Sequence, residues 1–368
     1  MVSVDPAARA GSDRDRATLT VAVTGAAGML GRHLTERLLR DGHRVHGLDL
    51  RAPEGSADGG RAGGSLDWTV TDVRDGRAVS AALAQARPDV VVHTAAALPS
   101  YPREQIRSTI VGGTREVFRA AAAAGVGRVV HVSSTAVYGL PSVVPTTEEY
   151  PREPTDDYSG AKADAELVAE EYRSDGRCVS ILRPKTFLGP GRMGLFAMLF
   201  EWAQEGRNFP VLGQGDVRIQ MLAVEDLVEG VLTVMRAPDD VANDTYNLAA
   251  TRFGTIREQF QAVLDEAGHG RRVVSVPAAP SVAALGLLQR AGLSPVYGRL
   301  LHKLRGDSYV SVDKAAERLG FTPRLSTEEA LLRTYRWWRA EGRGVSASGN
   351  TSQQPWRQGV LSAAKVFF

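Results

Sequence analysis

The sequence predicts an α/β fold, in which a doubly wound parallel sheet is followed by a smaller C-terminal lobe. Short apolar segments alternate with segments of helical periodicity, and the first apolar segment ends in a glycine-rich turn. Strands that are joined through helices run parallel and carry helices on both faces. The Gly, Pro and aromatic residues after Pro184 end this alternation and indicate where a second lobe begins.

The regular alternation begins at Leu19. Residues 19–23 form the first predicted strand, and Leu30, Leu34 and Leu38 recur at four-residue spacing on a helix that packs against the sheet. The next predicted strand covers residues 45–50. We predict further strands near residues 66–70, 89–94, 128–134 and 178–183, helices near 76–86, 104–124 and 157–174, and sheet-like segments at 217–224 and 245–248.

Composition and charge narrow the classes of function. The 368 residues, 43% of them hydrophobic, can bury a large core. A formal net charge of +2 favours neither nucleic acid nor an anionic membrane as a partner. No run approaches the ~18 apolar residues of a membrane span, and the N-terminal segment lacks the apolar centre of a signal peptide. We therefore expect a cytoplasmic protein.

Cysteine and histidine usage argues against disulfides and metals. The single cysteine, Cys178, lies in an apolar run and is expected to be a buried, inert thiol. The seven histidines lack metal-ligand spacing, and His93 and His131 lie near strand ends, where packing or hydrogen bonding explains them. We expect no metal site.

The glycine-rich turn contains Gly25, Gly28 and Gly31 and leads directly into the first helix. Glycines at this place permit a tight turn, let the backbone approach a pyrophosphate and let the helix pack closely on the strand. The phosphates then lie at the positive helix N-terminus. The turn therefore predicts a Rossmann-type dinucleotide site.

Asp49 ends the second strand, where a carboxylate can accept hydrogen bonds from both hydroxyls of the adenosine ribose. A 2′-phosphate would meet a like charge there, which favours NAD as the cofactor. Arg51 could pair with such a phosphate, so NADP stays the less favoured alternative.

Four kinds of segment are expected along the chain. They are a disordered lead-in (1–17), an NAD-binding Rossmann domain (18–183, with returning segments at about 215–250), a substrate-binding lobe (184–214 and 251–341) and a flexible tail (342–368).

Tyr158 and Lys162 lie one turn apart on the predicted helix 157–174 and therefore face the same side. A free phenol has a pKa near 10, so a tyrosine that acts as a base near pH 7 needs ~4 kcal/mol of stabilisation of its anion. One cation ~4 Å away supplies ~4 kcal/mol at an effective dielectric constant of ~20. Ser133 and Ser134 follow the fifth strand at the carboxyl edge of the sheet, where a serine can bind the substrate oxygen.

From about Thr20 to Trp338 the sequence resembles the extended short-chain dehydrogenase/reductase family, also called the NAD-dependent epimerase/dehydratase family. The resemblance covers most of the chain and rests on several motifs in a fixed order. These are the Thr24–Gly31 turn, Asp72-Val73, His93-Thr94-Ala95-Ala96, Ser133–Gly139, Tyr158 with Lys162, Arg183-Pro184 leading to Gly189-Pro190, Val224-Glu225-Asp226-Leu227, and Lys314-Ala315 followed by Leu319–Pro323.

The resemblance implies roles for individual residues. Tyr158, Lys162 and Ser134 would be catalytic, because Ser134 precedes Tyr138 at the spacing of the family's catalytic Ser or Thr, which leaves Ser133 a structural role. Asp72 and Val73 would hold the adenine. The full set of implied cofactor contacts is Gly25, Gly28, Met29, Leu30, Gly31, Asp49, Asp72, Val73, Ala95, Ala96, Lys162 and Pro184.

Departures from the family pattern narrow the chemistry. Family dehydratases carry an acidic pair after the catalytic Ser or Thr, and a related decarboxylation needs a glutamate there, but Thr135 and Ala136 occupy these positions. Both reactions are therefore disfavoured. An arginine that grips a diphosphate in nucleotide-sugar enzymes is replaced by Ile219, with Arg218 adjacent and Arg305 as another candidate.

The resemblance thus implies an NAD-dependent sugar epimerase, with a small-molecule substrate that is expected to be a nucleotide sugar. In this hypothesis Tyr158 removes a hydroxyl proton as hydride passes to NAD, the keto intermediate rotates, and hydride returns to its other face. The alternative is an NAD(P)-dependent dehydrogenase or reductase of a non-nucleotide alcohol, ketone or aldehyde, since residues 307–314 are similar to hydroxysteroid-dehydrogenase-like members. A remote alternative is a non-catalytic dinucleotide sensor. The family also leads us to expect a homodimer.

Overall fold

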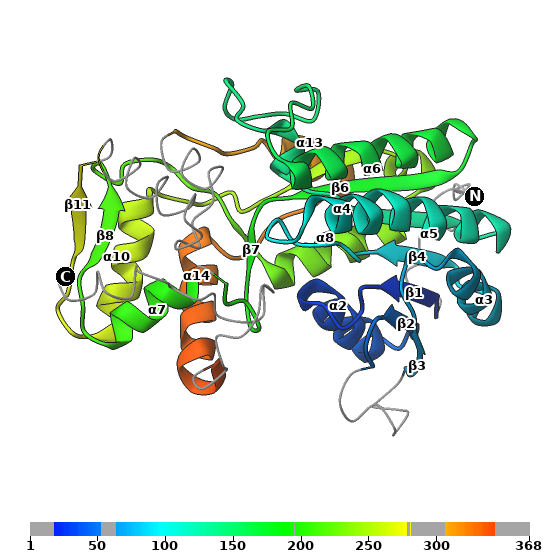
Figure 1. Ribbon diagram of the computed structural model, residues 1–368, viewed down its shortest axis with the longest axis horizontal. Coiled ribbons are helices and arrows are strands. Elements are labelled where there is room, and N and C mark those ends of the chain that lie inside the picture. Colours follow the sequence, from blue (N-terminus) through cyan, green and yellow to red (C-terminus); the bar gives the residue numbers. More distant parts are fainter. Residues whose placement is uncertain (1–17, 53–63, 195, 278–279, 281–305, 343–368) are drawn as a thin grey trace, which may run out of the picture.

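A computed structural model of the chain describes residues 18–52, 64–194, 196–277, 280 and 306–342 (Figure 1). The predicted lead-in (1–17), nearly all of the predicted tail (343–368) and Arg305 lie outside the described residues.

A seven-stranded parallel sheet forms the larger part of the molecule, with the strand order β10-β6-β5-β4-β1-β2-β3 (Figure 1). The chain winds outward from β1 in both directions, so the strand order switches between β1 and β4. At such a point the carboxyl ends of the strands leave a crevice for a ligand. The strands are β1 (Thr20–Thr24), β2 (Arg44–Asp49), β3 (Ser65–Val70), β4 (Val90–His93), β5 (Arg128–Val132), β6 (Cys178–Pro184) and β10 (Thr245–Leu248).

Helices cover both faces of this sheet, which confirms the predicted doubly wound architecture. On one face Leu34 and Val231 pack against Val23 of the sheet, and on the other face Phe118 packs near Val91. The first face carries α2 (Met29–Arg40) and α8 (Val224–Arg236), and the second carries α3 (Gly76–Ala86), α5 (Gly113–Ala123) and α6 (Asp157–Ser174).

Two predicted helices have the predicted bounds, because a side-chain cap defines where each begins. The carboxylate of Asp75 accepts hydrogen bonds at the start of α3, and Asp156 forms a capping box with Ser159 at the start of α6. The predicted helix near 104–124 is interrupted. It consists of α4 (Arg103–Arg107), a π-helical turn η1 (Ser108–Gly112) and α5.

A second hydrophobic cluster forms a smaller lobe beside the sheet, on the left in Figure 1. Phe200, Trp202 and Tyr335 are fully buried in it, and Trp338 packs against them. The lobe contains α7 (Phe196–Gln204), β8 (Phe209–Leu212), α10 (Ile256–Ala267), β11 (Val273–Val276), α14 (Thr327–Trp337) and η3 (Trp338–Gly342).

Short elements connect the two parts. The predicted strand at 217–224 is reduced to β9 (Leu222–Ala223), which pairs with β7 (Phe187–Leu188) outside the main sheet, whereas 245–248 joins the main sheet as predicted. The other short elements are η2 (Thr135–Tyr138), α9 (Asp239–Ala242) and α13 (Asp313–Leu319).

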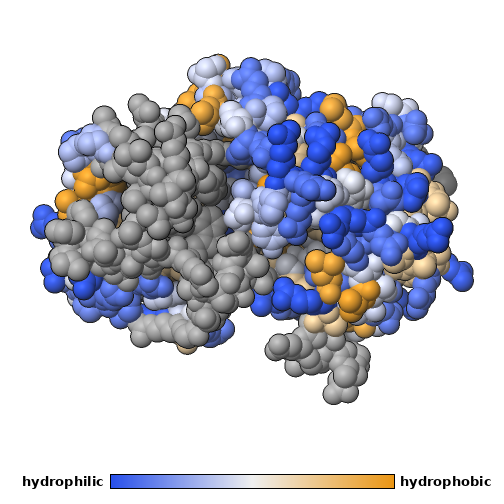
Figure 2. Space-filling model, in the orientation of Figure 1, coloured by the Kyte–Doolittle hydropathy of each residue, from blue (hydrophilic) through white to orange (hydrophobic). Residues whose placement is uncertain are grey.

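The described surface in Figure 2 is mostly hydrophilic, with small separate hydrophobic patches.

Cys178 is partly exposed, not buried as predicted, because it is the first residue of β6 and lies at the end of the strand. Within the described parts of the chain, no helix is long and apolar enough to cross a membrane. The same residues contain no group of three His, Cys, Asp or Glu side chains that could hold a metal ion.

Candidate active site

The turn after β1 leaves no room for a side chain at Gly25 or Gly31. Gly25 has a φ of +69°, and a Cβ there would lie 2.7 Å from the backbone nitrogen of Ala95. A Cβ on Gly31 would lie 2.2 Å from the carbonyl oxygen of Gly25. Gly28 is the N-cap of α2, whose first backbone N–H groups lack a side-chain partner at the cap. The turn therefore presents bare backbone and a helix N-terminus to a ligand.

A cavity of about 330 Å³ opens at the carboxyl edge of the sheet beside this turn. This volume lies in the range of small-molecule sites. The cavity is lined by residues from the ends of β1, β4, β5 and β6 and from α6. The described lining residues are Gly25, Gly28, Met29, Leu30, Gly31, Thr94, Ala96, Ala97, Leu98, Pro99, Val132, Ser133, Ser134, Thr135, Ala136, Tyr158, Lys162, Pro184, Lys185, Thr186, Phe187 and Arg192.

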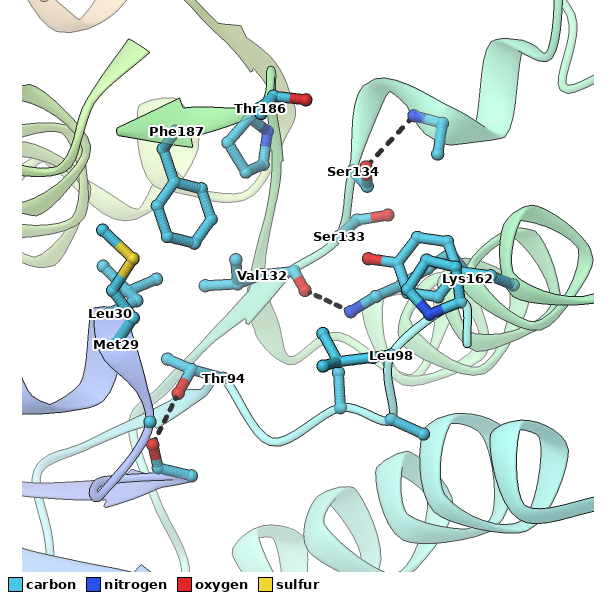
Figure 3. A pocket seen from close by; sticks show the side chains of 18 of the residues that line it. Met29, Leu30, Thr94, Leu98, Val132, Ser133, Ser134, Lys162, Thr186 and Phe187 are labelled. Carbon is cyan, nitrogen blue, oxygen red and sulfur yellow. Dashed lines mark hydrogen bonds between the residues drawn. The ribbon is translucent and has the colours of Figure 1, made fainter. Parts of the chain in front are cut away.

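All three predicted catalytic residues line this cavity. Tyr158 and Lys162 come from the first turns of α6, and Ser134 is the N-cap of η2, where its hydroxyl accepts a hydrogen bond from the backbone of Ala136. Figure 3 shows Ser134 and Lys162 on one side of the cavity and Met29, Leu30 and Phe187 on the other.

Lys162 is held in place by the backbone. Its Nζ donates a hydrogen bond of 2.8 Å to the carbonyl oxygen of Val132 at the end of β5 (Figure 3). Burial lowers the pKa of Lys162 to about 8, although the negative charge of Glu166 opposes this shift. A lysine with a pKa near neutrality can exchange protons in the range where a hydroxyl–ketone conversion needs them.

A buried polar network lies beneath the catalytic residues, and sequence reasoning missed its centre. Glu166 is fully buried, accepts hydrogen bonds from Arg183 at 2.7 and 3.0 Å, and also accepts one from the hydroxyl of Ser133. Arg183 in turn donates to the hydroxyl of Tyr138. The network joins α6, which carries Lys162, to β6, which ends in Pro184, and to the segment after β5, which contains Ser134.

A signal for Glu166 was present in the sequence. It lies one helical turn after Lys162, on the same helix face as two buried alanines, Ala163 and Ala169. A carboxylate on a buried helix face is paired in almost every protein. Ser133 is held by this carboxylate, whereas the hydroxyl of Ser134 lies at the cavity.

Four of the predicted cofactor contacts do not line the cavity. Asp49 accepts a hydrogen bond of 3.0 Å from the backbone of Ala27, and Asp72 forms a bidentate ion pair with Arg74. The other two are Val73, which is buried next to Gly113, and Ala95, which packs against Gly25. All four lie at or just after the ends of strands β2, β3 and β4, along the same edge of the sheet.

The buried histidines have no place in the cavity. His93 bonds Thr24 and Thr114, and it stacks on His131 at a ring distance of 5.5 Å. Burial lowers the pKa of His93 to about 3 and holds the pKa of His131 well below its usual value. Both rings are therefore neutral at physiological pH, as packing groups should be.

The parallel sheet, the bare glycine turn at its switch point and the Tyr158–Lys162 pair beside it define a class: dinucleotide-dependent enzymes of the Rossmann type. The comparison with family models specifies the class further, because residues 21–249 match the NAD dependent epimerase/dehydratase family. The chain belongs to this family, and it is an enzyme.

Curated relatives cover most of the chain. An uncharacterized protein, y4nG of Sinorhizobium fredii, is 33% identical over 94% of this chain and 86% of its own length. A UDP-glucose 4-epimerase of Mycolicibacterium smegmatis is 29% identical over 86% of this chain and 97% of its own length. A 3 beta-hydroxysteroid dehydrogenase/Delta 5-->4-isomerase of Mycobacterium tuberculosis is 28% identical over 84% of this chain and 88% of its own length.

Among solved structures, the Bordetella bronchiseptica enzyme WbmG in complex with NAD superposes with a TM-score of 0.71 at 22% identity, covering 89% of this chain and 96% of that chain. This likeness shows the fold. The cofactor of the family is NAD, and the residues of this chain fit it, because Gly25, Gly28 and Gly31 line the cavity and the uncapped N-terminus of α2 begins there.

Proposed function

We propose that the protein is a sugar epimerase that acts on a nucleotide-activated sugar. NAD, when bound, supplies a hydride acceptor and donor at its nicotinamide ring. Gly25, Gly28 and Gly31 would hold its diphosphate, and Asp49 would hold its adenosine ribose. Lys162 and Pro184 would lie at the nicotinamide end.

Tyr158 removes the proton of a sugar hydroxyl and later returns it. Lys162 stabilises the phenolate through its charge, which the backbone contact with Val132 keeps in place. Ser134 lies at the cavity, where its hydroxyl can hold the reacting sugar oxygen.

The observation that carries this proposal is the chemistry of the cavity lining. Among the described lining residues there is one tyrosine and no aspartate or glutamate. Inverting a carbinol carbon needs one group that moves a hydroxyl proton in both directions, whereas elimination of water needs a further acid and base. Thr135 and Ala136, at the positions of the dehydratase pair, supply neither.

Arg218 supports a nucleotide diphosphate as part of the substrate. Ile219, at the family's arginine position, packs against the core of the smaller lobe. The guanidinium of the exposed Arg218 lies 4.8 Å from the ring centre of Phe253 and 4.9 Å from that of Tyr309. The two rings contact each other with their centres 5.2 Å apart, and a cation that lies against both can serve the phosphates of a nucleotide while the rings serve its base.

The test is turnover of UDP-glucose and of UDP-glucuronate by the NAD-loaded protein. Tyr158→Phe should lower kcat by a factor of about 10²–10⁴, the usual contribution of a general acid–base group, and leave NAD binding unchanged. Tyr172→Phe is the matched control, since Tyr172 lies on the same helix but packs against Phe118. Full activity of Tyr158→Phe would contradict the proposal.

The state of the cofactor after turnover distinguishes an epimerase from an oxidoreductase. A hydroxysteroid dehydrogenase among the relatives suggests the second activity. An epimerase regenerates NAD in place, so native mass spectrometry of the purified protein should find NAD retained. Stoichiometric release of NADH during turnover, with an alcohol that is not a sugar nucleotide, would instead favour net oxidation.

A further inference from the structure

Lys185 is a second buried lysine at the cavity. It is 7% exposed, follows Pro184 directly and lines the cavity together with Pro184 and Thr186. Its backbone nitrogen bonds the carbonyl oxygen of Leu248 at 2.9 Å, so the segment continues the pairing of β6 with β10. Lys185 is therefore fixed by the sheet at the carboxyl end of β6.

The side chain of Lys185 reaches a segment far away in sequence. Its Nζ lies 3.1 Å from the hydroxyl oxygen of Ser308. Ser308 is held in place by a bridge to Ile219, and the neighbouring Asp307 accepts a hydrogen bond from the backbone nitrogen of Arg218. Lys185 and Ser308 thus lie next to Arg218, on the side of the smaller lobe.

Lysine is rare in this chain, which makes the choice of an ammonium group informative. The sequence has only five lysines, Lys162, Lys185, Lys303, Lys314 and Lys365, and uses arginine for nearly all its positive charge. Two of the three lysines within the described residues line the cavity. An ammonium group is a compact point charge with three donors, and it binds a single oxyanion without the planar geometry of a guanidinium.

The charged side chains among the described lining residues are all positive. Lys162, Lys185 and Arg192 line the cavity, and no described lining residue is acidic. An anionic ligand in the cavity would be attracted to these positive charges. The hydroxyl of Ser308, which accepts from Nζ, can donate its own proton to the same ligand oxygen.

The phosphates of the dinucleotide are too far away to be this anion. They would lie at the glycine turn after β1, and β6 is three strands from β1 in the order β6-β5-β4-β1. At ~4.8 Å between neighbouring strands the two strand ends are roughly 14 Å apart. This separation leaves the substrate as the source of the anion.

We propose that Lys185 and Ser308 form a subsite for an oxyanion of the substrate, either a carboxylate on the sugar ring or a phosphoryl oxygen of the nucleotide. The proposal deepens the proposed function and rests on it for the nucleotide-sugar class. Lys185 determines specificity and takes no part in the proton transfer, which belongs to Tyr158 and Lys162.

The experiment compares Lys185→Met, Lys185→Arg and the control Lys314→Met, each loaded with NAD. Lys314 pairs with Asp244 outside the cavity, so this control also loses one ammonium group. Isothermal titration measures the affinity of each protein for UDP, UDP-glucose and UDP-glucuronate. Lys185→Met should lower the affinity for the affected ligands at least about tenfold. The affinity should partly recover in Lys185→Arg and stay unchanged in Lys314→Met.

The pattern over the ligands identifies the anion. A loss confined to UDP-glucuronate indicates a sugar carboxylate, and an equal loss for all three ligands indicates a phosphoryl group. Unchanged affinity for every ligand in Lys185→Met would overturn the subsite.

Failure of the proposed function has a different signature, because the wild-type protein would then bind none of the three nucleotides. Saturation-transfer NMR with D-glucuronate, D-glucose 1-phosphate and D-glucose then tests the subsite by itself. Binding of the two anions, but not of glucose, that is lost in Lys185→Met supports it. Equal signals in both proteins, or no signal from either anion, contradict it.

Discussion

Lys162 owes its properties to its surroundings in space. The carbonyl of Val132 fixes its Nζ, burial disfavours its charge, and Glu166 partly restores it. The same helix carries Tyr158 one turn earlier, so a single element sets both the position and the charge of the pair.

We predict that Lys162 titrates with a pKa of about 8 in the folded, NAD-free protein. The folded pKa lies below the ~10.4 of an unfolded lysine, so folding disfavours the charged form at every pH below 8. This cost falls as the pH rises from 8 to about 10.4, and the free energy of unfolding gains a corresponding contribution. NMR of lysines labelled with ¹³C at Cε measures the pKa directly, and a midpoint at or above 10 would contradict the prediction.

Glu166 is predicted to be essential for stability. Glu166→Gln leaves the buried guanidinium of Arg183 without its counter-charge, and we expect a loss of about 3–5 kcal/mol in the free energy of unfolding. Glu170→Gln is the control. Arg152 pairs with both Glu166 and Glu170, but the side chain of Glu170 is 38% exposed, so this variant should lose about 1 kcal/mol or less of the free energy of unfolding. Urea denaturation measures both, and equal losses would show that the network is not critical.

At the scale of elements, caps and glycines explain where prediction succeeded. Helices α3 and α6 begin where Asp75 and Asp156 cap them, and both residues are recognisable in the sequence. The π-helical turn in 108–112 has no such local signal, and the predicted strand 128–134 ends at Val132, where its pairing with β6 ends.

Gly31 tests the tight packing of α2 on the glycine turn. A Cβ at this position would lie 2.2 Å from one backbone atom and 2.6 Å from another, and backbone cannot move aside cheaply. Gly31→Ala should therefore weaken NAD binding at least about tenfold and lower stability by about 1–3 kcal/mol. Nothing lies within 4 Å of a Cβ on Gly112, so Gly112→Ala should leave NAD affinity, measured by fluorescence titration, unchanged.

At the scale of the whole molecule, the large hydrophobic clusters belong to two parts of the described chain. One cluster lies on each face of the sheet, and another fills the smaller lobe around Phe200 and Trp202. The catalytic residues belong to the sheet side, whereas Ser308 and Arg218 come from segments that return after the smaller lobe has begun. The predicted domain bounds and the expected homodimer stay predictions.

NAD should stabilise the whole protein, because it binds the folded state alone. At 100 times its dissociation constant the free energy of unfolding should rise by about 2.7 kcal/mol. NADP at the same concentration should raise it less, since its 2′-phosphate would meet the Asp49 carboxylate. Thermal denaturation with each dinucleotide measures the difference, and a larger shift with NADP would contradict the role of Asp49.

The sequence by itself determined the succession of strands and helices along the chain, the glycine turn and the spacing of Tyr158 and Lys162. These features depend on local periodicity and on neighbours one helical turn apart. Only the tertiary structure decided that Lys185 meets Ser308 across 123 residues, and that Glu166 joins Ser133 to Arg183. Such contacts depend on which strands lie side by side and which way each strand end turns. Those properties follow from the packing of the whole sheet, and no local pattern of residues records them.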